Sequence, residues 1–432
     1  MSHVEEPPTT EDSSPGIFSS LKFTDCRRLW LATAMAQSAS WALIVLRGAL
    51  VYDLTKSNAW VGGVTAAAML PALFVTPLSG LMADRFDRRR LLAVTYILNL
   101  AQNLFLASIV ISGNATEYHI LILAIVNGSI RAIEMPTNQA LLPSLIPREQ
   151  LQNAVALTQL MQQGARMMGP LLMLPFISFF SPGPAFFVAA ALYAIGWFQI
   201  IGIKTTSRGV IDSGKGVVSN LVEGVRYIYL HPLLLFIMLI AVFHCALTMA
   251  FETIFPFFSR STLGLISEKQ IFEGPTFLMI GVGTGAIFGT LLLARIREAK
   301  TRGWLFLWFG IISGLSPVLL SFTFNIPTAM VAAGLMGAST AGFMTLSHGM
   351  VQAITPDAVR GRVLGANTWH VLGAMAGFNL VNGRLMDLSW MTPELLLSAT
   401  GILFVWIMVA SFLVHHLRSI YTRGIPSTTL KA

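Results

Sequence analysis

The sequence Gly80-Leu81-Met82-Ala83-Asp84-Arg85-Phe86-Asp87-Arg88-Arg89-Arg90 places two aspartates and four arginines between two long apolar runs. Each run has about 20 residues or more, the length that a helix needs to cross the hydrocarbon core of a bilayer. A short arginine-rich segment between two such helices is typical of a cytoplasmic hairpin in a membrane protein. The stretch therefore predicts a chain that crosses a membrane and turns back at this point.

The composition of the whole chain agrees with a membrane protein. Hydrophobic residues make up 54% of the 432 positions and charged residues 11%, whereas a soluble domain carries roughly 25% charged residues. Backbone polar groups in lipid have no water to bind, so the spans must be helices. We expect an all-α polytopic membrane protein with twelve transmembrane helices, at 29–53, 60–83, 90–112, 117–140, 153–179, 183–203, 233–258, 274–294, 303–323, 327–352, 364–386 and 394–416.

The distribution of positive charge predicts the orientation. Most of the 28 lysines and arginines fall in connections that share one side of the membrane, and the loops on the other side hold only Lys56, Arg260 and Lys269. Basic residues are retained on the cytoplasmic side, so we expect both termini in the cytoplasm and the protein in the inner or plasma membrane. This topology accounts for the net charge of +8, and we expect no nucleic-acid partner.

The longest polar connection, 204–232, divides the chain into two groups of six spans. Its second part reads as an amphipathic helix at the inner membrane surface. The expected organisation is a disordered cytoplasmic tail at 1–20, a first half at 21–203, the cytoplasmic connection at 204–232, a second half at 233–416 and a cytoplasmic tail at 417–432.

The two halves carry related signals at a constant offset. Residues 145–149 (LIPRE) return 209 positions later as 354–358 (ITPDA), and the hairpin after Gly80 has a weaker basic counterpart after Gly289, again 209 positions later. Two pseudo-symmetric six-helix halves explain both coincidences. Secondary transporters often have paired halves with the substrate site between them.

The segment from Gly80 to Arg90 resembles the signature Gly-x-x-x-Asp-Arg/Lys-x-Gly-Arg/Lys-Arg/Lys of the major facilitator superfamily, with Asp87 in place of the second glycine. The resemblance runs almost end to end and is sharpest to the branch that includes enterobactin exporters and related efflux proteins. Further matching segments are Leu29-Trp30, 51–57 (VYDLTKS), 134–141 (EMPTNQAL), 153–157 (NAVAL), 166–170 (RMMGP) and 360–363 (RGRV). The resemblance implies the twelve-helix fold of that superfamily.

The resemblance also implies a gating role for the hairpin. Its expected gating residues are Gly80, Asp84, Arg85, Arg88 and Arg89. Gly80 lets two helices approach closely, and Asp84 accepts hydrogen bonds from a helix N-terminus or an arginine when the inner side is closed. A purely topological role is the alternative for the arginines, but it does not require Asp84.

Charges inside the bilayer are costly unless they are paired or face water. We therefore expect proton coupling or a substrate cavity at Arg47, Arg131, Glu134, Arg166, His244 and Glu252. Most of these residues lie on the first, fourth and seventh spans, which the resemblance implies line the cavity.

Each of these charges also has a structural alternative. Arg131 and Glu134 are three residues apart on one helix and can pair with each other. Glu252 has no basic neighbour in its span, which suits a proton carrier, but a pair with Arg47 or Arg384 would make it an outer latch. His244 could titrate near neutral pH, or it could be a hydrogen-bonded contact between helices.

The spans contain no residue pattern of an enzyme. They hold no Ser/His, paired-Asp or His-Glu-x-x-His arrangement. The segment 281–285 (GVGTG) is not followed by the Lys-Ser/Thr of a nucleotide loop. Gly281, Gly285 and Gly289 are spaced four residues apart and predict a helix contact. With only Cys26 and Cys245, neither a disulfide framework nor a metal cluster is expected. We expect no enzymatic activity, no cofactor and no metal.

The expected function is that of a secondary active transporter. The combined signals favour a monomeric, proton-coupled exporter of a small organic molecule, drug-like or siderophore-like, that works by alternating access. The alternatives are a receptor or scaffold that keeps the fold without transport, and an importer.

Overall fold

The computed structural model describes residues 18–180, 182–208, 217–294, 296 and 298–424, and every regular element in these ranges is a helix. The predicted tail at 1–20 therefore lies almost entirely outside the described residues. The first half contains α1 (Thr24–Thr55), α2 (Asn58–Arg85), α3 (Arg88–Ile111), α4 (Glu117–Leu141), α5 (Leu151–Phe179) and α6 (Pro182–Gly202). The second half contains α8 (Pro232–His244), α9 (Phe255–Ser261), α10 (Glu268–Ala294), α11 (Ala299–Ser321), α12 (Ile326–Ile354), α13 (Asp357–Met386) and α14 (Pro393–Ser411).

The long helices account for the predicted spans. Among the described residues, ten helical segments are long and apolar enough to cross a membrane. The two remaining predicted spans correspond to α5 and α13, which have 29 and 30 residues but are more polar. A helix of that length rises about 40 Å, so both are long enough to cross the bilayer.

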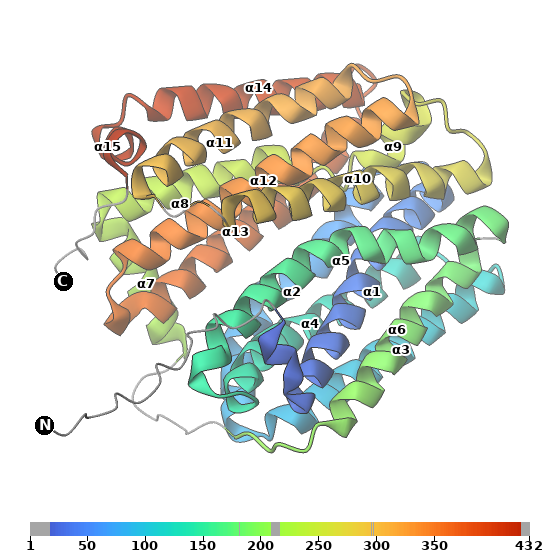
Figure 1. Cartoon of the computed structure of the whole chain (residues 1–432). Helices are drawn as coiled ribbons and strands as arrows, with labels where there is room; N and C mark the ends of the chain where they lie inside the picture. The colour runs from blue at the N-terminus through green and yellow to red at the C-terminus, as the bar shows by residue number, and fades with distance from the viewer. Residues whose placement is uncertain (1–17, 181, 209–216, 295, 297, 425–432) are drawn as a thin grey trace, which may run out of the picture.

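The two halves repeat the same packing. In the first half α2 packs against α4 and α3 against α6, and in the second half α10 packs against α12 and α11 against α14. Figure 1 shows the halves as two bundles lying side by side. Between them, α2 lies against α13 and α5 lies against α10. We call the end at which α1 begins and α14 ends the termini end, and the opposite end the far end.

The seventh span is broken, where the sequence predicts a continuous helix over 233–258. After α8, a π-helical turn (Cys245–Met249) leads into non-helical residues 250–254, and α9 then completes the crossing. Pro256 has no N–H to donate to the carbonyl of Glu252, which favours a break at this point, and it stands in the first turn of α9, where a proline is tolerated. The freed backbone is served by α13, whose Asn382 Nδ2 donates to the carbonyl of Ala250 at 3.0 Å.

Close backbone contact between α10 and α12 explains the glycine spacing of the eighth span. A Cβ at Gly281 would lie 2.5 Å from the carbonyl oxygen of Met330, and one at Gly285 would overlap the carbonyl of Gly334. The small residues let the two helices meet backbone to backbone, as is common in membrane bundles. The predicted helix contact is therefore confirmed.

Two short helices lie at the termini end. α7 (Val217–Leu230) falls where the sequence predicts an amphipathic helix and packs against α13, where Glu223 accepts a hydrogen bond from Arg362. α15 (His415–Arg423) packs against α11 with Leu417, Ile420 and Tyr421 buried. The predicted C-terminal tail at 417–432 thus begins within a helix, and its residues 425–432 lie outside the described part.

Candidate functional site

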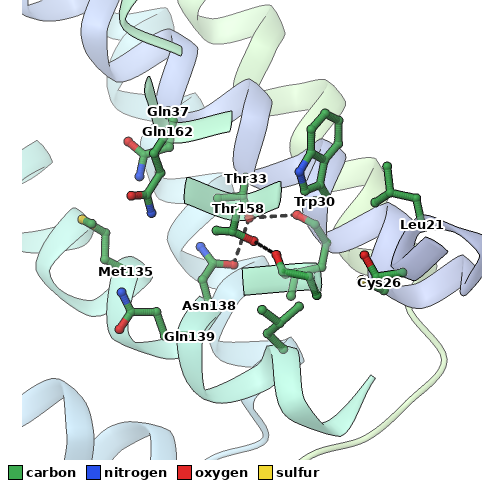
Figure 2. A pocket seen from close by; sticks show the side chains of 14 residues that line it. Leu21, Cys26, Trp30, Thr33, Gln37, Met135, Asn138, Gln139, Thr158 and Gln162 are labelled. Carbon is green, nitrogen blue, oxygen red and sulfur yellow. Dashed lines mark hydrogen bonds between the residues drawn. The ribbon is translucent and has the colours of Figure 1, made fainter. Parts of the chain in front are cut away.

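A pocket with an empty volume of about 550 Å³, partly open to solvent, lies in the first half at the termini end. Its walls come from the start of α1, the end of α4 and the start of α5. The lining mixes apolar side chains with uncharged polar ones. The apolar residues are Leu21, Cys26, Leu29, Trp30, Met135, Leu142 and Ala154, and the hydroxyl and amide residues are Ser20, Thr33, Gln37, Asn138, Gln139, Thr158 and Gln162. Figure 2 shows Thr33 and Asn138 facing each other in this pocket, where their side-chain oxygens are 3.4 Å apart. Such a lining suits an amphiphilic organic solute.

Two arginines contact consecutive turns of α1. Arg131 lies where the pocket ends on the side away from the termini end, and Arg166 lies one turn farther along α1. Arg131 of α4 donates from Nη2 to the Oε1 atom of Gln37 at 3.3 Å. The guanidinium of Arg166, on α5, lies over the ring of Trp41, with its central carbon 4.5 Å from the ring centroid. Gln37 and Trp41 are four residues apart, which corresponds to about 6 Å along a helix. The face of α1 that lines the pocket therefore continues into a strip with two cationic groups.

Glu134 is buried behind this strip, in a chain of hydrogen bonds across three helices. Arg47 Nη1 donates to Asn127 Oδ1 at 3.1 Å, and Asn127 Nδ2 donates to Asn99 Oδ1 at 2.9 Å. Asn99 Nδ2 then donates to Glu134 Oε2 at 3.2 Å. Glu134 and Arg47 are each only 4% exposed. The chain links a buried cation to a buried carboxyl group without direct contact between them.

Arg131 and Glu134 do not form the ion pair that their spacing allows. Both lie in the described part of the chain, and no nitrogen of Arg131 lies within 4.0 Å of a Glu134 oxygen. The two groups still interact electrostatically, but their hydrogen bonds go to Gln37 and Asn99. The two residues therefore make hydrogen bonds in different directions. Arg131 bonds toward the pocket, and Glu134 bonds into the interior of the first half.

Glu252 sits in the break of the seventh span, where the two halves meet. The residue is 8% exposed and its Oε2 atom has no hydrogen-bond partner. It borders a small apolar packing gap together with Val45 and Gly48 of α1. The basic group that acts on it electrostatically is Arg166. The alternative ion pair of Glu252 with Arg47 or Arg384 does not form among the described residues, since no nitrogen of either arginine lies within 4.0 Å of a Glu252 oxygen.

His244 lies inside the second half, away from the pocket. Its Nε2 atom is 2.9 Å from Ser313 Oγ, and its ring stacks on Phe343 with centroids 4.3 Å apart. The side chain is fully buried. These contacts account for His244 as a hydrogen-bonded packing residue between helices.

The far end is closed by contacts between the halves. Asp387, which follows α13, accepts hydrogen bonds from Ser57 Oγ at 2.6 Å and from the backbone N–H groups of Asn58 and Ala59 at 2.7 and 3.1 Å. It therefore caps the N-terminus of α2 from the other half. A second contact joins Ser178 of α5 to Glu273 of α10 at 2.6 Å. Every hydrogen bond between described residues of the two halves lies at the far end or near the middle.

The hairpin from Gly80 to Arg90 lies at the termini end. Gly80 and Asp84 belong to the last turns of α2, and the Asp84 side chain lies outside the described part of the structure. Arg85 is exposed, whereas Arg88 donates to the carbonyl of Ala140 at 3.0 Å and Arg89 to that of Ile201 at 2.9 Å. These two arginines tie the hairpin to the ends of α4 and α6.

Asp87 has a role that explains why aspartate replaces glycine in the signature. Its Oδ1 atom accepts a hydrogen bond from the backbone N–H of Arg90 at 2.9 Å, so it is the N-cap of α3. Aspartate is among the preferred residues for this position. The replacement therefore supports the start of α3.

Sequence similarity extends over almost the entire chain. Residues 15–427 match the family described as MFS_3, transmembrane secretion effector. The chain belongs to this family of major facilitator superfamily transporters. Its members move small molecules across membranes and are not enzymes. The expected superfamily is thereby confirmed.

Relatives of this MFS transporter are distant. The multidrug efflux pump Tap of Mycobacterium tuberculosis is 22% identical, over 82% of this chain and 85% of its own length. The staphyloferrin A transporter of Staphylococcus aureus is 22% identical over 72% and 77%. Among solved structures, the nucleoside transporter NupG superposes with a TM-score of 0.68 at 12% identity, covering 92% of this chain and all of NupG. A peptide transporter, POT, in complex with sulfate superposes with a TM-score of 0.70 at 10% identity, covering 92% and 94%. These structures share the fold.

Sequence reasoning missed several residues of this site. Trp41 carries no signal of its own, because only the fold places it under Arg166. Asn99 could have been recognised from the sequence, because an amide side chain in the middle of an apolar span is costly unless it forms hydrogen bonds. Asp387 was noticeable only as an acid at a span end, and its partners are about 330 residues away in sequence.

Asp387→Asn is expected to loosen the closed far end. The substitution removes the negative charge at the N-terminus of α2, which contributes about 0.3–1 kcal/mol and up to about 2 kcal/mol in a partly buried position. We expect the amides of Asn58 and Ala59 to exchange hydrogen for deuterium several times faster in the variant, as measured by mass spectrometry of the protein in nanodiscs. Asp53→Asn is the matched control, because Asp53 pairs only with Lys56 within the same helix end. Equal exchange in Asp387→Asn and the wild type would show that the cap does not hold the halves together.

Proposed function

We propose that this MFS transporter is a proton-coupled exporter of a small organic molecule, working by alternating access with both termini in the cytoplasm. The observation that carries the proposal is the arrangement around Glu252. A partly open pocket lies at one end, the halves are joined at the other, and a buried carboxyl group with a free oxygen lies where the halves meet. Alternating access requires this asymmetry between the two ends.

Two buried carboxyl groups support the coupling to protons. Glu134 and Glu252 are almost completely buried, and neither lies within 4.0 Å of a basic nitrogen in the described residues. A carboxyl group in such a site can exist in both protonation states as its surroundings change between conformations. Glu134 is connected to Arg47 through the hydrogen bonds of Asn99 and Asn127. Glu252 interacts electrostatically with Arg166. The two carboxyl groups therefore have different partners.

The orientation and the direction are supported by charge and by the relatives. The connections at the termini end carry most of the basic residues, which favours the cytoplasm on that side. With this orientation the pocket faces the cytoplasm, where an exporter loads its substrate. Tap is named as a multidrug efflux pump and the Staphylococcus aureus relative as a staphyloferrin A transporter, and both names fit the movement of an organic solute.

We propose further that the hairpin forms a gate at the cytoplasmic side, with the residues Gly80, Asp84, Arg85, Arg88 and Arg89. In the described structure Arg88 and Arg89 bind carbonyl groups at the ends of α4 and α6. They hold the hairpin against its own half while the pocket is open. Asp84 is then the residue of the hairpin that changes partners during the cycle.

The test begins with cells and ends with the purified protein. Metabolites that accumulate in cells lacking the gene, and that are released when the protein is overproduced, identify the solute. The solute is then loaded into proteoliposomes that contain the transporter, and an imposed pH gradient should drive its movement with simultaneous proton flow in the opposite direction. Transport in which the pH gradient has no effect would overturn the coupling, and transport only toward the termini side would identify an importer.

A further inference from the structure

We infer that the strip formed by Arg166, Trp41 and Arg131 is a receptor for an oxyanion, so that the transported solute carries a carboxylate or a comparable planar anionic group. This inference rests on the proposed function, because it specifies the solute class for the same transporter. It concerns recognition alone, and it makes no use of the direction of transport or of the coupling ion.

Arg166 is held in place but has free donors. It makes no hydrogen bond and no ion pair with any described residue, and its guanidinium is fixed by the face of Trp41 at 4.5 Å. A guanidinium is a planar fork of five donors that matches a carboxylate in two parallel hydrogen bonds. Stacking on an aromatic ring covers one face of the fork and leaves its edge, which carries the N–H groups, available.

A ligand can reach the donors of Arg166. The residue is only half-buried, and none of its nitrogen atoms is among those sealed from solvent without a partner. Arg47 provides the contrast, because it is 4% exposed and its Nε and Nη2 atoms are both sealed and unpartnered. Of these two arginines, the structure therefore makes Arg166 the one that is open to a ligand.

The charge balance along α1 also favours an anionic ligand. Arg131 donates a hydrogen bond to Gln37, which lies one helical turn from Trp41. A second cation and an amide group therefore lie near the guanidinium of Arg166. Arg47, Arg131 and Arg166 outnumber Glu134 and Glu252, and the site stays net positive even with both acids ionised. Glu134 is also turned away, since its Oε2 atom accepts from Asn99. A cationic solute would meet this excess of positive charge, whereas an anionic one compensates for it.

The apolar part of the ligand has a place on the pocket side of the strip. Trp30 and Met135 line the pocket that continues from Gln37 toward the termini end. A solute with a planar anionic group at one end and an aromatic or aliphatic body can place the anion on Arg166 and the body against these side chains. This combination describes an amphiphilic organic acid.

Binding of defined probes to the purified full-length protein in nanodiscs tests the inference. Salicylate and citrate are the anionic probes and tetraphenylphosphonium is the cationic one, each titrated by calorimetry at low ionic strength and without a pH gradient. We expect saturable binding of at least one anion and an affinity at least tenfold lower in Arg166→Gln. Arg166→Lys keeps the charge without the fork and should lose about three- to tenfold.

The matched control is Arg384→Gln, which removes an arginine from an exposed position on α13 outside the pocket. It should bind the anions as the wild type does. Absence of saturable anion binding to the wild type, or equal binding by Arg166→Gln, would overturn the receptor. Binding of tetraphenylphosphonium that is lost in Glu252→Gln, with no anion bound, would instead make the site a receptor for cations.

The outcomes for the receptor and for the proposed function are separable. Anion binding that depends on Arg166, together with transport that ignores a pH gradient, supports the receptor and contradicts proton coupling. Proton-driven transport of a solute without any anionic group, unaffected by Arg166→Gln, supports the exporter and contradicts the receptor.

Discussion

Glu252→Gln is expected to abolish transport driven by a pH gradient, with a loss of at least about 100-fold in rate, while the protein remains folded. Glutamine keeps the shape and the hydrogen-bonding capacity of the side chain but cannot take up or release a proton. The loss corresponds to about 2.7 kcal/mol in the barrier of the coupled step. The same reasoning applies to Glu134→Gln, because its carboxyl group is the other one buried near the arginine strip.

The measurement uses the identified solute in proteoliposomes, with a pH-sensitive dye reporting proton movement and size-exclusion chromatography reporting the fold. Glu149→Gln is the control, since Glu149 is exposed in the short turn before α5. Solute exchange at equal pH on both sides should survive in Glu252→Gln if only coupling is lost. If both acid variants respond to the pH gradient as the wild type does, neither carboxyl group carries the proton.

Gly62→Val is expected to prevent the far end from closing. A Cβ at Gly62 would overlap the carbonyl oxygen of Asn379 and lie 3.2 Å from the Cα atom of Gly383. Both obstacles are backbone atoms of α13, so the clash is relieved only when α2 and α13 separate. Overpacking of this kind costs about 1–3 kcal/mol, which changes the ratio of closed to open molecules by about 5- to 150-fold.

The neighbouring residue supplies the control. A Cβ at Gly63 would have no atom within 4 Å, so Gly63→Val changes the same helix by the same group without the clash. Spin labels attached after Ser112→Cys and Asn325→Cys substitutions, one in each half at the far end, report the separation by double electron–electron resonance. Gly62→Val should increase the population of long distances, and Gly63→Val should not. Identical distance distributions in all three proteins would show that the two helices do not limit closure.

The fold was predictable from the sequence because the bilayer imposes strong rules on it. The length of each apolar run and the arginines of the hairpin define the spans and their order without any tertiary information. The glycines at 281 and 285 likewise predicted a helix contact, since small residues four apart make a smooth face. The predicted spans failed at one place, where Pro256 breaks the seventh helix at Glu252.

The site was predictable only in its charged members. The energetic cost of an ionisable side chain inside the membrane singles out Glu134, Arg166 and Glu252, because such a side chain is retained only where it is paired or has a function. The partners of these residues come from other helices and from contacts that no local pattern encodes. Glu252 interacts electrostatically with Arg166 for this reason, and the ring of Trp41 belongs to the site only because α1 and α5 lie side by side.

The break in the seventh span gives the two parts of one membrane crossing different neighbours. α8 is fixed inside the second half, where His244 is bound to Ser313 and stacked on Phe343. α9 packs mainly against α10 of the same half and also reaches α1, where the rings of Phe257 and Tyr52 are 6.1 Å apart. Substitutions in α8 should therefore act on heat resistance, whereas substitutions at Phe257 should also change the contact between the halves and with it the speed of the cycle. Durability and throughput are then set by different residues of a single membrane crossing.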